Sequence, residues 1–147
     1  MNGLIERYKS FLDEGKTERE CVRRTIALAE ANGYRRLESV ESLKCGDKVY
    51  VEDYEKAIAL FHIGSEPMEK GMNILGAHID SPRLDIKMNP LYESEGLVYL
   101  DTHYYGGIKK YQWVAMPLAI HGVVVKTTGE KINVVLGEED DEFTFTI

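Results

Sequence analysis

The sequence predicts an α/β fold up to about residue 90 and a β-only portion after it. Two segments near the start space their apolar residues as amphipathic helices do, and strand-like segments follow them. No further helical spacing appears beyond residue 90. A chain of 147 residues is long enough for one compact domain with a real core. The change of pattern nevertheless predicts a boundary near residues 88–95, and we divide the chain into residues 1–90 and 91–147.

The composition excludes several classes of protein. Hydrophobic residues make up 44% and charged residues 29% of the chain, as in ordinary soluble domains. The formal net charge of −7 argues against a nucleic-acid partner, which needs a basic surface. The longest apolar stretch, 114–125, is too short and too interrupted to span a bilayer, and the N-terminus lacks the apolar segment of a signal peptide. Cys21, expected to be a buried thiol, and Cys45 indicate no disulfide framework and favour a reducing, cytoplasmic compartment.

Residues 4–14 are predicted to form the first helix, and Gly15 is expected to end it. Thr17 and Glu20 have the spacing of a capping box, which predicts that a second helix begins there. Asn32 and Gly33 form a typical helix stop. The buried stripe of the second helix is expected to comprise Val22, Ile26 and Ala29.

Strands are expected to follow the helices. Residues 34–43 form a connector, which packs on the core or faces a partner; the pattern leaves both open. Residues 48–52 alternate as a half-buried strand does. Residues 57–63 are more continuously apolar, which predicts a deeper strand in which His62 is a hydrogen-bonded core residue rather than a ligand. The apolar run 73–77 predicts a short buried strand.

The second part shows strand and turn patterns. Asn89-Pro90 is expected to be a turn, and Thr128-Gly129-Glu130 a hairpin turn. The acidic run 137–142 lacks the alternating spacing of a calcium loop and is expected to be a solvated turn. His121, on a strand, is expected to be a core histidine like His62. Strands are predicted at 97–100, 113–115, 119–126, 132–136 and 143–146.

His78 and Asp80 follow the predicted strand 73–77. Side chains at positions i and i+2 leave a strand on the same face, so both can point into a cleft at the strand's carboxyl end. A neutral imidazole binds divalent transition metals, and a nearby carboxylate can bind the metal too or orient a neighbouring ligand. Taken alone, the pattern favours a His and an Asp at a strand end that are satisfied by hydrogen bonds.

Longer strings change this balance. The string 76–82 with 84–87 resembles the first active-site motif of the M18 (aspartyl aminopeptidase-like) metallopeptidases. The resemblance extends in order from about residue 5 to the end, and it is also visible in 102–108, Trp113, 117–119 and 122–125. It implies a co-catalytic two-metal aminopeptidase that removes N-terminal residues from peptides, with divalent metal, expected to be zinc. The fold it implies is a partial zinc-exopeptidase-like sheet with an all-β dimerisation domain inserted after the first motif.

The resemblance also implies roles for individual residues. By that match His78 is a ligand of one metal, and Asp80 is the catalytic acid that holds and polarises it. The metals of such enzymes polarise the scissile carbonyl and activate a water. The family's chain is longer, and its bridging Asp, catalytic Glu and remaining ligands lie beyond the residues matched here. We therefore expect the chain to be the N-terminal portion of such an enzyme, truncated or cleaved, and inactive alone.

A second candidate group is found at 103–107. Paired glycines let the backbone approach a ligand closely, and the aromatic residues beside them can wall a substrate pocket. We therefore name His103, Tyr105, Gly106 and Gly107 as candidate substrate-binding residues. A tight turn with packed tyrosines explains the glycines and tyrosines equally well, and the pattern favours a His103 that simply lies on the surface.

Two function classes remain at this point. The first is the enzyme, whose partners would be a peptide substrate and either identical subunits or a complementary C-terminal portion. The alternative is a non-catalytic fragment that acts only in self-association through its β portion. A partial sheet with an uncovered edge and face predicts association in either case.

Overall fold

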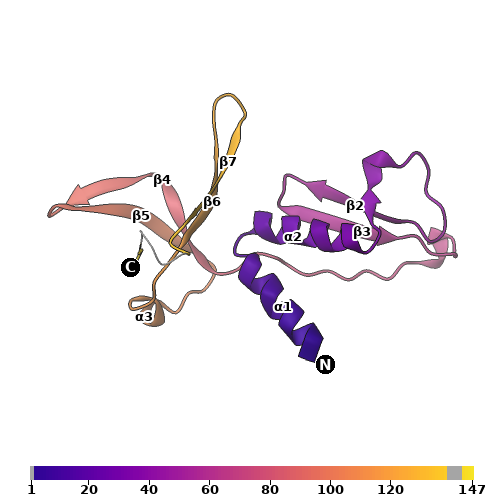
Figure 1. Ribbon diagram of the computed structural model, residues 1–147, viewed down its shortest axis with the longest axis horizontal. Helices are drawn as coiled ribbons and strands as arrows, with labels where there is room; N and C mark the ends of the chain where they lie inside the picture. The colour runs from indigo at the N-terminus through magenta and orange to yellow at the C-terminus, as the bar shows by residue number, and fades with distance from the viewer. Residues whose placement is uncertain (1, 139–143) are drawn as a thin grey trace. The chain divides into compact units, whose positions relative to one another are not determined.

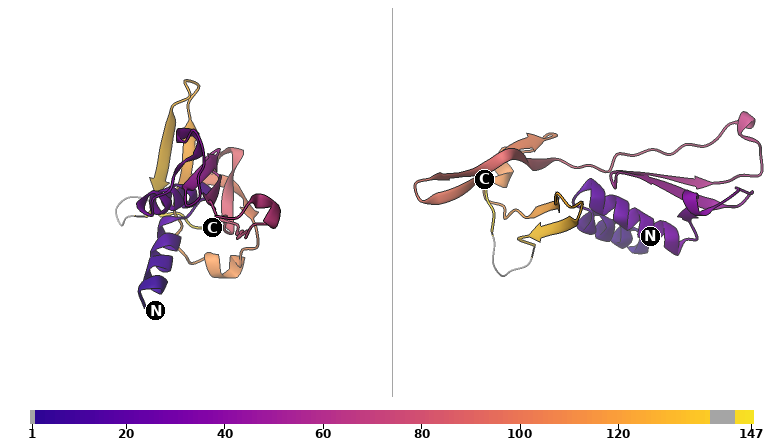
Figure 2. Two further views of the ribbon diagram at one scale, coloured as in Figure 1. Left: turned by 90° about the vertical axis from the view of Figure 1, so that its right-hand side faces the viewer. Right: turned by 90° about the horizontal axis from the view of Figure 1, so that it is seen from above.

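The computed structural model describes residues 2–138 and 144–147, which fall into two compact units, Met1–Asp80 and Ser81–Ile147. The first unit contains α1, α2, β1, β2 and β3, and the second contains β4, β5, α3, β6 and β7 (Figures 1 and 2). The combination of helices and small sheets confirms the α/β class. The two units divide between Asp80 and Ser81, whereas the assignment of residues 91–147 to an inserted domain stays a prediction.

The two predicted helices are confirmed. α1 spans Asn2–Glu14 and α2 spans Glu18–Ala31. The predicted capping box is present, because the Thr17 amide donates to Glu20 Oε2 (2.8 Å) and the Glu20 amide donates to Thr17 Oγ1 (3.4 Å). These bonds satisfy two amides that the first turn of a helix cannot satisfy itself. After α2 the chain turns at Gly33, whose φ of +83° suits a residue without a Cβ.

Gly15 separates the helices because two parts of the chain approach closely there. A Cβ at this position would lie 2.7 Å from Cys21 Sγ, which donates to the Gly15 carbonyl oxygen at 3.3 Å. Cys21 is buried, as predicted, and both cysteines of the chain are free. Burial raises the pKa of the Cys21 thiol, and the carboxylates of Glu20 and Glu18 raise it further.

The core of the first unit lies between α2 and β2 (Lys48–Asp53). Val49 and Tyr50 are 0% exposed. The Tyr50 hydroxyl donates to Glu30 Oε1 at 2.6 Å, and this hydrogen bond together with burial raises the pKa of Tyr50. Ile26, expected in the buried stripe, is only half-buried. The buried apolar side chains are Cys21, Val22, Ala29, Val49 and Tyr50.

The first sheet has the order β1-β2-β3, with β1 (Arg35–Arg36) parallel and β3 (Ala57–His62) antiparallel to β2. The strand predicted at 57–63 is present as β3, but the prediction that it lies deep is wrong. Ile58 alone is half-buried in β3, and His62 is exposed rather than a core histidine. The reason is the position of β3 at the edge of the sheet, where among the described strands only β2 pairs with it.

The predicted strand at 73–77 is also wrong. Residues 71–82 form no regular secondary structure, and no described strand pairs with them. The side chain of Leu75 is 100% exposed and that of Ile74 is 79% exposed. A strand is defined by its ladder of hydrogen bonds, so an apolar run without a pairing partner remains irregular.

The β4–β5 ribbon begins the second unit. β4 (Arg83–Ser94) pairs antiparallel with β5 (Leu97–Tyr105), and the register shifts between Ile86 and Leu91. Asn89 and Pro90 lie in this shift, so the turn predicted there is wrong and a bulge takes its place. Proline, which lacks an amide hydrogen, is tolerated at the free edge or the bulge of a two-stranded ribbon.

The β6–β7 ribbon confirms the hairpin predicted at 128–130. β6 (Ile120–Val125) pairs antiparallel with β7 (Lys131–Leu136), and Gly129 in the turn has a φ of +85°. The strand predicted at 113–115 is wrong, because Trp113 ends the short helix α3 (Lys110–Trp113). The second unit therefore contains a helical turn among its strands, and an all-β dimerisation portion is not shown.

The chain's last residues only partly test the sequence analysis. Phe145 forms an isolated antiparallel bridge with Leu118 in place of the strand predicted at 143–146. Phe143 and most of the acidic run 137–142 lie outside the described residues.

The second unit buries little. None of its described residues is buried. One face of the β6–β7 ribbon is nevertheless wholly apolar, because cross-strand pairs share a face. The pairs on that face are Ile120 with Leu136, Gly122 with Val134, and Val124 with Ile132.

Candidate functional site

His78 and Asp80 lie in contact at the end of the first unit. His78 Nδ1 is 2.9 Å from the backbone oxygen of Asp80 and 3.2 Å from its Oδ1. The His78 side chain is 83% exposed, and that of Asp80 is 33% exposed. The contact therefore turns one edge of the imidazole toward the Asp80 carboxylate and leaves the rest of the ring open to solvent.

The contact also assigns the tautomer of the imidazole. A carbonyl oxygen can only accept a hydrogen bond, so Nδ1 must carry the hydrogen that it donates to Asp80. In the neutral ring Nε2 then has the free lone pair, and an exposed Nε2 lone pair suits a divalent metal. A carboxylate on the other nitrogen is the usual means by which proteins orient such a ligand and raise its basicity. The pair thus fits one ligand of a metal and the acid that holds it.

This pair does not by itself make a complete metal site. Catalytic zinc uses about three protein ligands and structural zinc about four. Among residues 2–138 and 144–147 no group of three or more His, Cys, Asp or Glu side chains could hold a metal ion. Further ligands would have to come from residues other than the described ones.

The candidate substrate-binding residues lie in the second unit, at and just after the end of β5. His103 is exposed, stands opposite Asp85 in the register and lines a hollow of about 560 Å³. Lys87 and Asp101 line the same hollow and form an ion pair, with 3.0 Å between Nζ and Oδ2. This side of the ribbon is open and charged, and His103 is available for contact with a ligand.

Tyr105 and Gly106 have internal contacts instead. The guanidinium of Arg83 lies 4.2 Å from the centroid of the Tyr105 ring. Gly106 has a φ of +71°, and a Cβ there would lie 3.4 Å from the Cα of Pro82. Gly107 is exposed, with open space around the position of a Cβ.

Sequence reasoning missed Arg83 as a residue of interest. Its Nε donates to Asp85 Oδ1 at 2.7 Å, in addition to the contact with Tyr105. The Arg-x-Asp spacing predicts the contact between Arg83 and Asp85, because residues at i and i+2 of a strand lie on one face. The spacing alone does not predict the contact with Tyr105, which lies on the neighbouring strand.

His121 has a partner of its own. Its Nε2 lies 2.7 Å from Glu138 Oε1, and its side chain is only 13% exposed. His121, on β6, is thus a half-buried histidine with a carboxylate partner. This arrangement is typical of a hydrogen-bonded histidine and not of a free ligand.

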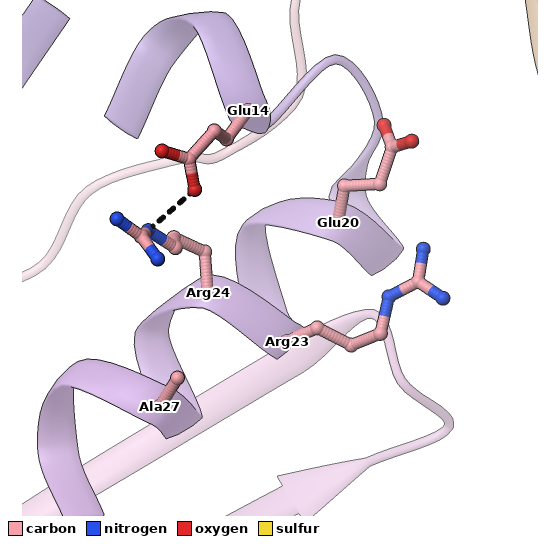
Figure 3. Close-up of a pocket in the computed structure, with 5 residues that line it drawn as sticks. All are labelled: Glu14, Glu20, Arg23, Arg24 and Ala27. Carbon is pink, nitrogen blue, oxygen red and sulfur yellow. Dashed lines mark ion pairs between the residues drawn. The ribbon is translucent and has the colours of Figure 1, made fainter. Parts of the chain in front are cut away.

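A second hollow, of about 310 Å³, lies beside α1 and α2 (Figure 3). Arg24 Nε and Glu14 Oε2 form an ion pair across it at 2.9 Å. Glu20, also at its rim, is occupied by the capping box of α2. Glu14, Arg24 and Glu20 thus already have charged or polar partners near this hollow, although Arg24 Nε makes no hydrogen bond among the described residues. The lining residues of the hollow are Glu14, Glu20, Arg23, Arg24 and Ala27.

Comparisons with known proteins agree on one family. The family model described as "Aminopeptidase I zinc metalloprotease (M18)" matches residues 11–143. A probable M18 family aminopeptidase 1 from Clostridium acetobutylicum is 56% identical over 148 residues, which are 98% of this chain and 32% of that protein. Its counterpart from Thermotoga maritima is 41% identical over 147 residues, 100% of this chain and 32% of that protein.

Solved structures give the same result. Aminopeptidase I from Borrelia burgdorferi B31 matches with a TM-score of 0.90 and 39% identity, over 99% of this chain and 37% of that one. The M18 aminopeptidase from Thermotoga maritima matches with a TM-score of 0.91 and 39% identity, over 99% and 32%. The chain therefore spans about a third of the length of the relatives that it matches.

Proposed function

Because this chain belongs to the M18 family of zinc metalloproteases, we propose that it supplies the amino-terminal portion of a metalloaminopeptidase. The whole enzyme would remove N-terminal residues from peptides. The observation that supports this most directly is the contact between His78 and Asp80, which holds the imidazole in the tautomer that leaves Nε2 free for a metal.

The two residues have different roles in this proposal. His78 would bind one metal through Nε2. Asp80 would accept the hydrogen bond from Nδ1, which fixes the ring plane and makes Nε2 a stronger donor. Without His78 the metal would lose a ligand and no longer bind at this position. Without Asp80 the ligand would still be present, but its ring would no longer be held in the right orientation.

The metal itself would be zinc, as the family's description states. We propose two ions in the complete site, with the remaining ligands supplied by residues outside this chain. When bound, such ions polarise the scissile carbonyl and lower the pKa of a bound water. Catalysis by the 147-residue chain alone is not expected, since its described residues supply too few ligands.

We propose that His103 is the best supported substrate-binding residue among the four candidates. It is exposed beside a charged hollow, whereas the Tyr105 ring face and Gly106 already contact Arg83 and Pro82. Gly107 remains a candidate by its exposed backbone alone.

The test of the metal role is His78→Ala in the full-length protein that contains this chain. We expect the variant to lose one metal ion per subunit and nearly all peptidase turnover, measured by elemental analysis and by release of N-terminal residues. His62→Ala is the matched control, because His62 is also an exposed histidine of the first unit. Unchanged metal content in His78→Ala, or an equal loss in His62→Ala, would contradict the assignment.

Asp80→Ala tests the orienting role. We expect activity to fall by about 10–100-fold, the usual effect of removing a residue that orients a metal ligand, while most of the metal is retained. A loss of metal as complete as in His78→Ala would instead make Asp80 a ligand.

The cellular location is likewise a proposal. No helix in the part of the chain that the structure describes is long and apolar enough to cross a membrane. Cys21 and Cys45 are both free thiols. We propose a cytoplasmic location, where free thiols persist.

A second candidate function is self-association of the β portion. The apolar face of the β6–β7 ribbon favours it, because a two-stranded ribbon cannot bury such a face by itself. Sedimentation of the 147-residue chain tests the idea. A dimer or larger species that Val124→Asp dissociates would support it, and a monomer at all concentrations would contradict it.

A further inference from the structure

We propose that Arg83 is a positioning residue that fixes the chain directly behind the His78-x-Asp80 motif. The proposal rests on the metal role proposed for His78, and it concerns residues to which that role assigns nothing. The structural question behind it is what holds an exposed ligand in place.

The backbone of the motif lies outside the described strands. Residues 71–80 pair with no described strand, and the His78 side chain is largely exposed. A metal ligand nevertheless needs a fixed position, since an error of about 1 Å can cost about 10²-fold in rate. The nearest strand ladder along the described chain is that of β4 and β5, which begins at Arg83. Only Ser81 and Pro82 separate it from Asp80.

Arg83 ties both strands together at this point. It is paired with Tyr105 in the first register position of the ribbon. Its guanidinium lies over the Tyr105 ring at 4.2 Å, and its Nε donates to Asp85 at 2.7 Å. The side chains of Arg83 and Asp85 are only 28% and 32% exposed, so solvent screens this ion pair less than a fully exposed one.

The restraint continues toward the motif through Pro82. Gly106, the residue after Tyr105, lies beside Pro82, and a Cβ there would be in van der Waals contact with the proline Cα at 3.4 Å. The proline ring fixes its own φ and biases Ser81 toward extended backbone. The backbone is therefore restrained from Pro82, two residues after Asp80.

The chemistry of this contact requires arginine. A planar guanidinium can stack on an aromatic ring while its Nε donates in the plane to a carboxylate. A lysine ammonium has the charge but neither the plane nor the Nε. Arg83→Lys is therefore a sharp test, since it preserves charge and approximate length.

The experiment uses the full-length protein. For Arg83→Lys we expect zinc affinity, measured by competition with a chelator, and kcat each to fall about tenfold, with KM within about twofold. The matched control is Arg36→Lys. Arg36 lies 5.3 Å from the Tyr50 ring and 3.7 Å from Glu52, so it also combines an aromatic ring with a carboxylate, here a glutamate instead of an aspartate. This control should retain wild-type zinc affinity and kcat.

A variant of Tyr105 tests the other side of the contact. Tyr105→Leu removes the ring over which the Arg83 guanidinium lies and should reproduce the losses of zinc affinity and kcat of Arg83→Lys. Wild-type zinc affinity in Tyr105→Leu would overturn the proposal. So would wild-type zinc affinity in Arg83→Lys, or equal losses in both arginine variants.

The proposed function and this inference fail differently. A wild-type full-length protein that binds no zinc and cleaves no peptide overturns both. An active, zinc-bound wild type with an unaffected Arg83→Lys variant overturns the inference alone.

Discussion

The two units of the chain differ in how they use their apolar residues. In residues 1–80 a helix and a strand bury five side chains completely or nearly so, with Val49 and Tyr50 at 0% exposure. In residues 81–147 the strands β4 and β5 are longer than any described strand of the first unit, yet none of the described residues is buried. The first unit has a small core of its own, and the second consists of ribbons without one.

This difference shows what local sequence can and cannot do. A hairpin turn and alternating side chains suffice to pair two strands, but two strands alone are at best marginally stable in water. A helix packed on a strand closes a core with fewer residues. The apolar face of the β6–β7 ribbon is consequently the surface that most needs a partner, whereas the core between α2 and β2 needs none.

The strongest test of the contrast is truncation of one apolar residue in each unit. Tyr50→Ala should lower the free energy of unfolding of the first unit by about 3–5 kcal/mol, the usual cost of removing a buried aromatic side chain. Val125→Ala, on the exposed β6 strand, should cost about 0.5 kcal/mol or less. Urea titrations provide separate probes, because circular dichroism reports on α1 and α2 while the single tryptophan, Trp113, reports on the second unit.

Equal effects of the two substitutions would contradict the contrast. A large effect of Val125→Ala on Trp113 fluorescence would indicate that the β6–β7 ribbon is packed in solution, against another copy of the chain or another part of the second unit. Repeating the titration at several protein concentrations distinguishes these two cases.

A smaller effect is expected at the start of α2. Thr17→Ala removes the side-chain oxygen of the capping box and should destabilise the first unit by about 1 kcal/mol. Thr17→Ser retains that oxygen and is the control. Loss of stability in the serine variant as well would show that the methyl group, not the cap, is responsible.

The smallest expected effect is a loss of stability of the first unit at alkaline pH. The pKa values of Cys21 and Tyr50 are raised in the folded chain, so folding favours their protonated forms. This stability is complete below the ordinary pKa values, 9.0 for the thiol and 10.0 for the phenol, and is lost as pH rises through the raised values of the folded state. The urea midpoint of the first unit should therefore fall above about pH 9.

Substitutions of Cys21 and Tyr50 show which of the two groups causes the fall of the urea midpoint at alkaline pH. Cys21→Ala should remove the earlier part of the decrease and Tyr50→Phe the later part. An unchanged decrease in the double variant would mean that other groups titrate. Because Tyr50→Phe also removes the hydrogen bond to Glu30, the comparison concerns the slope with pH and not the absolute midpoint.

The features that could be predicted from sequence are those that depend on near neighbours. The capping box at Thr17 and Glu20, the glycine that ends α1 and the hairpin turn at Gly129 each follow from residues a few positions apart. The M18 motif belongs to the same class, because it is a continuous string. His78 and Asp80 were correctly expected to lie beside each other, although the strand predicted to present them is absent.

The errors concern pairing partners that are distant in sequence. The apolar run 73–77 has a strand's composition, but composition does not provide a neighbouring strand. Asn89-Pro90 is typical of a turn, but the edge of a two-stranded ribbon tolerates a proline as well. The apolar residues of β3 predict a deep strand, whereas its depth is determined by how many strands flank it. Residues 113–115 have a strand's pattern, and α3 is too short for helical spacing to reveal it.

The proposed role of His78 is to supply one ligand of a metal site that other residues of the full-length protein complete. Calorimetric titration of the 147-residue chain with zinc is a direct test of this role. We expect weak binding without a defined stoichiometry, because His78 with Asp80 falls short of the roughly three ligands that a catalytic zinc requires. Tight binding of one zinc ion per chain, abolished by His78→Ala, would contradict the proposal, since it would require a complete site within these residues.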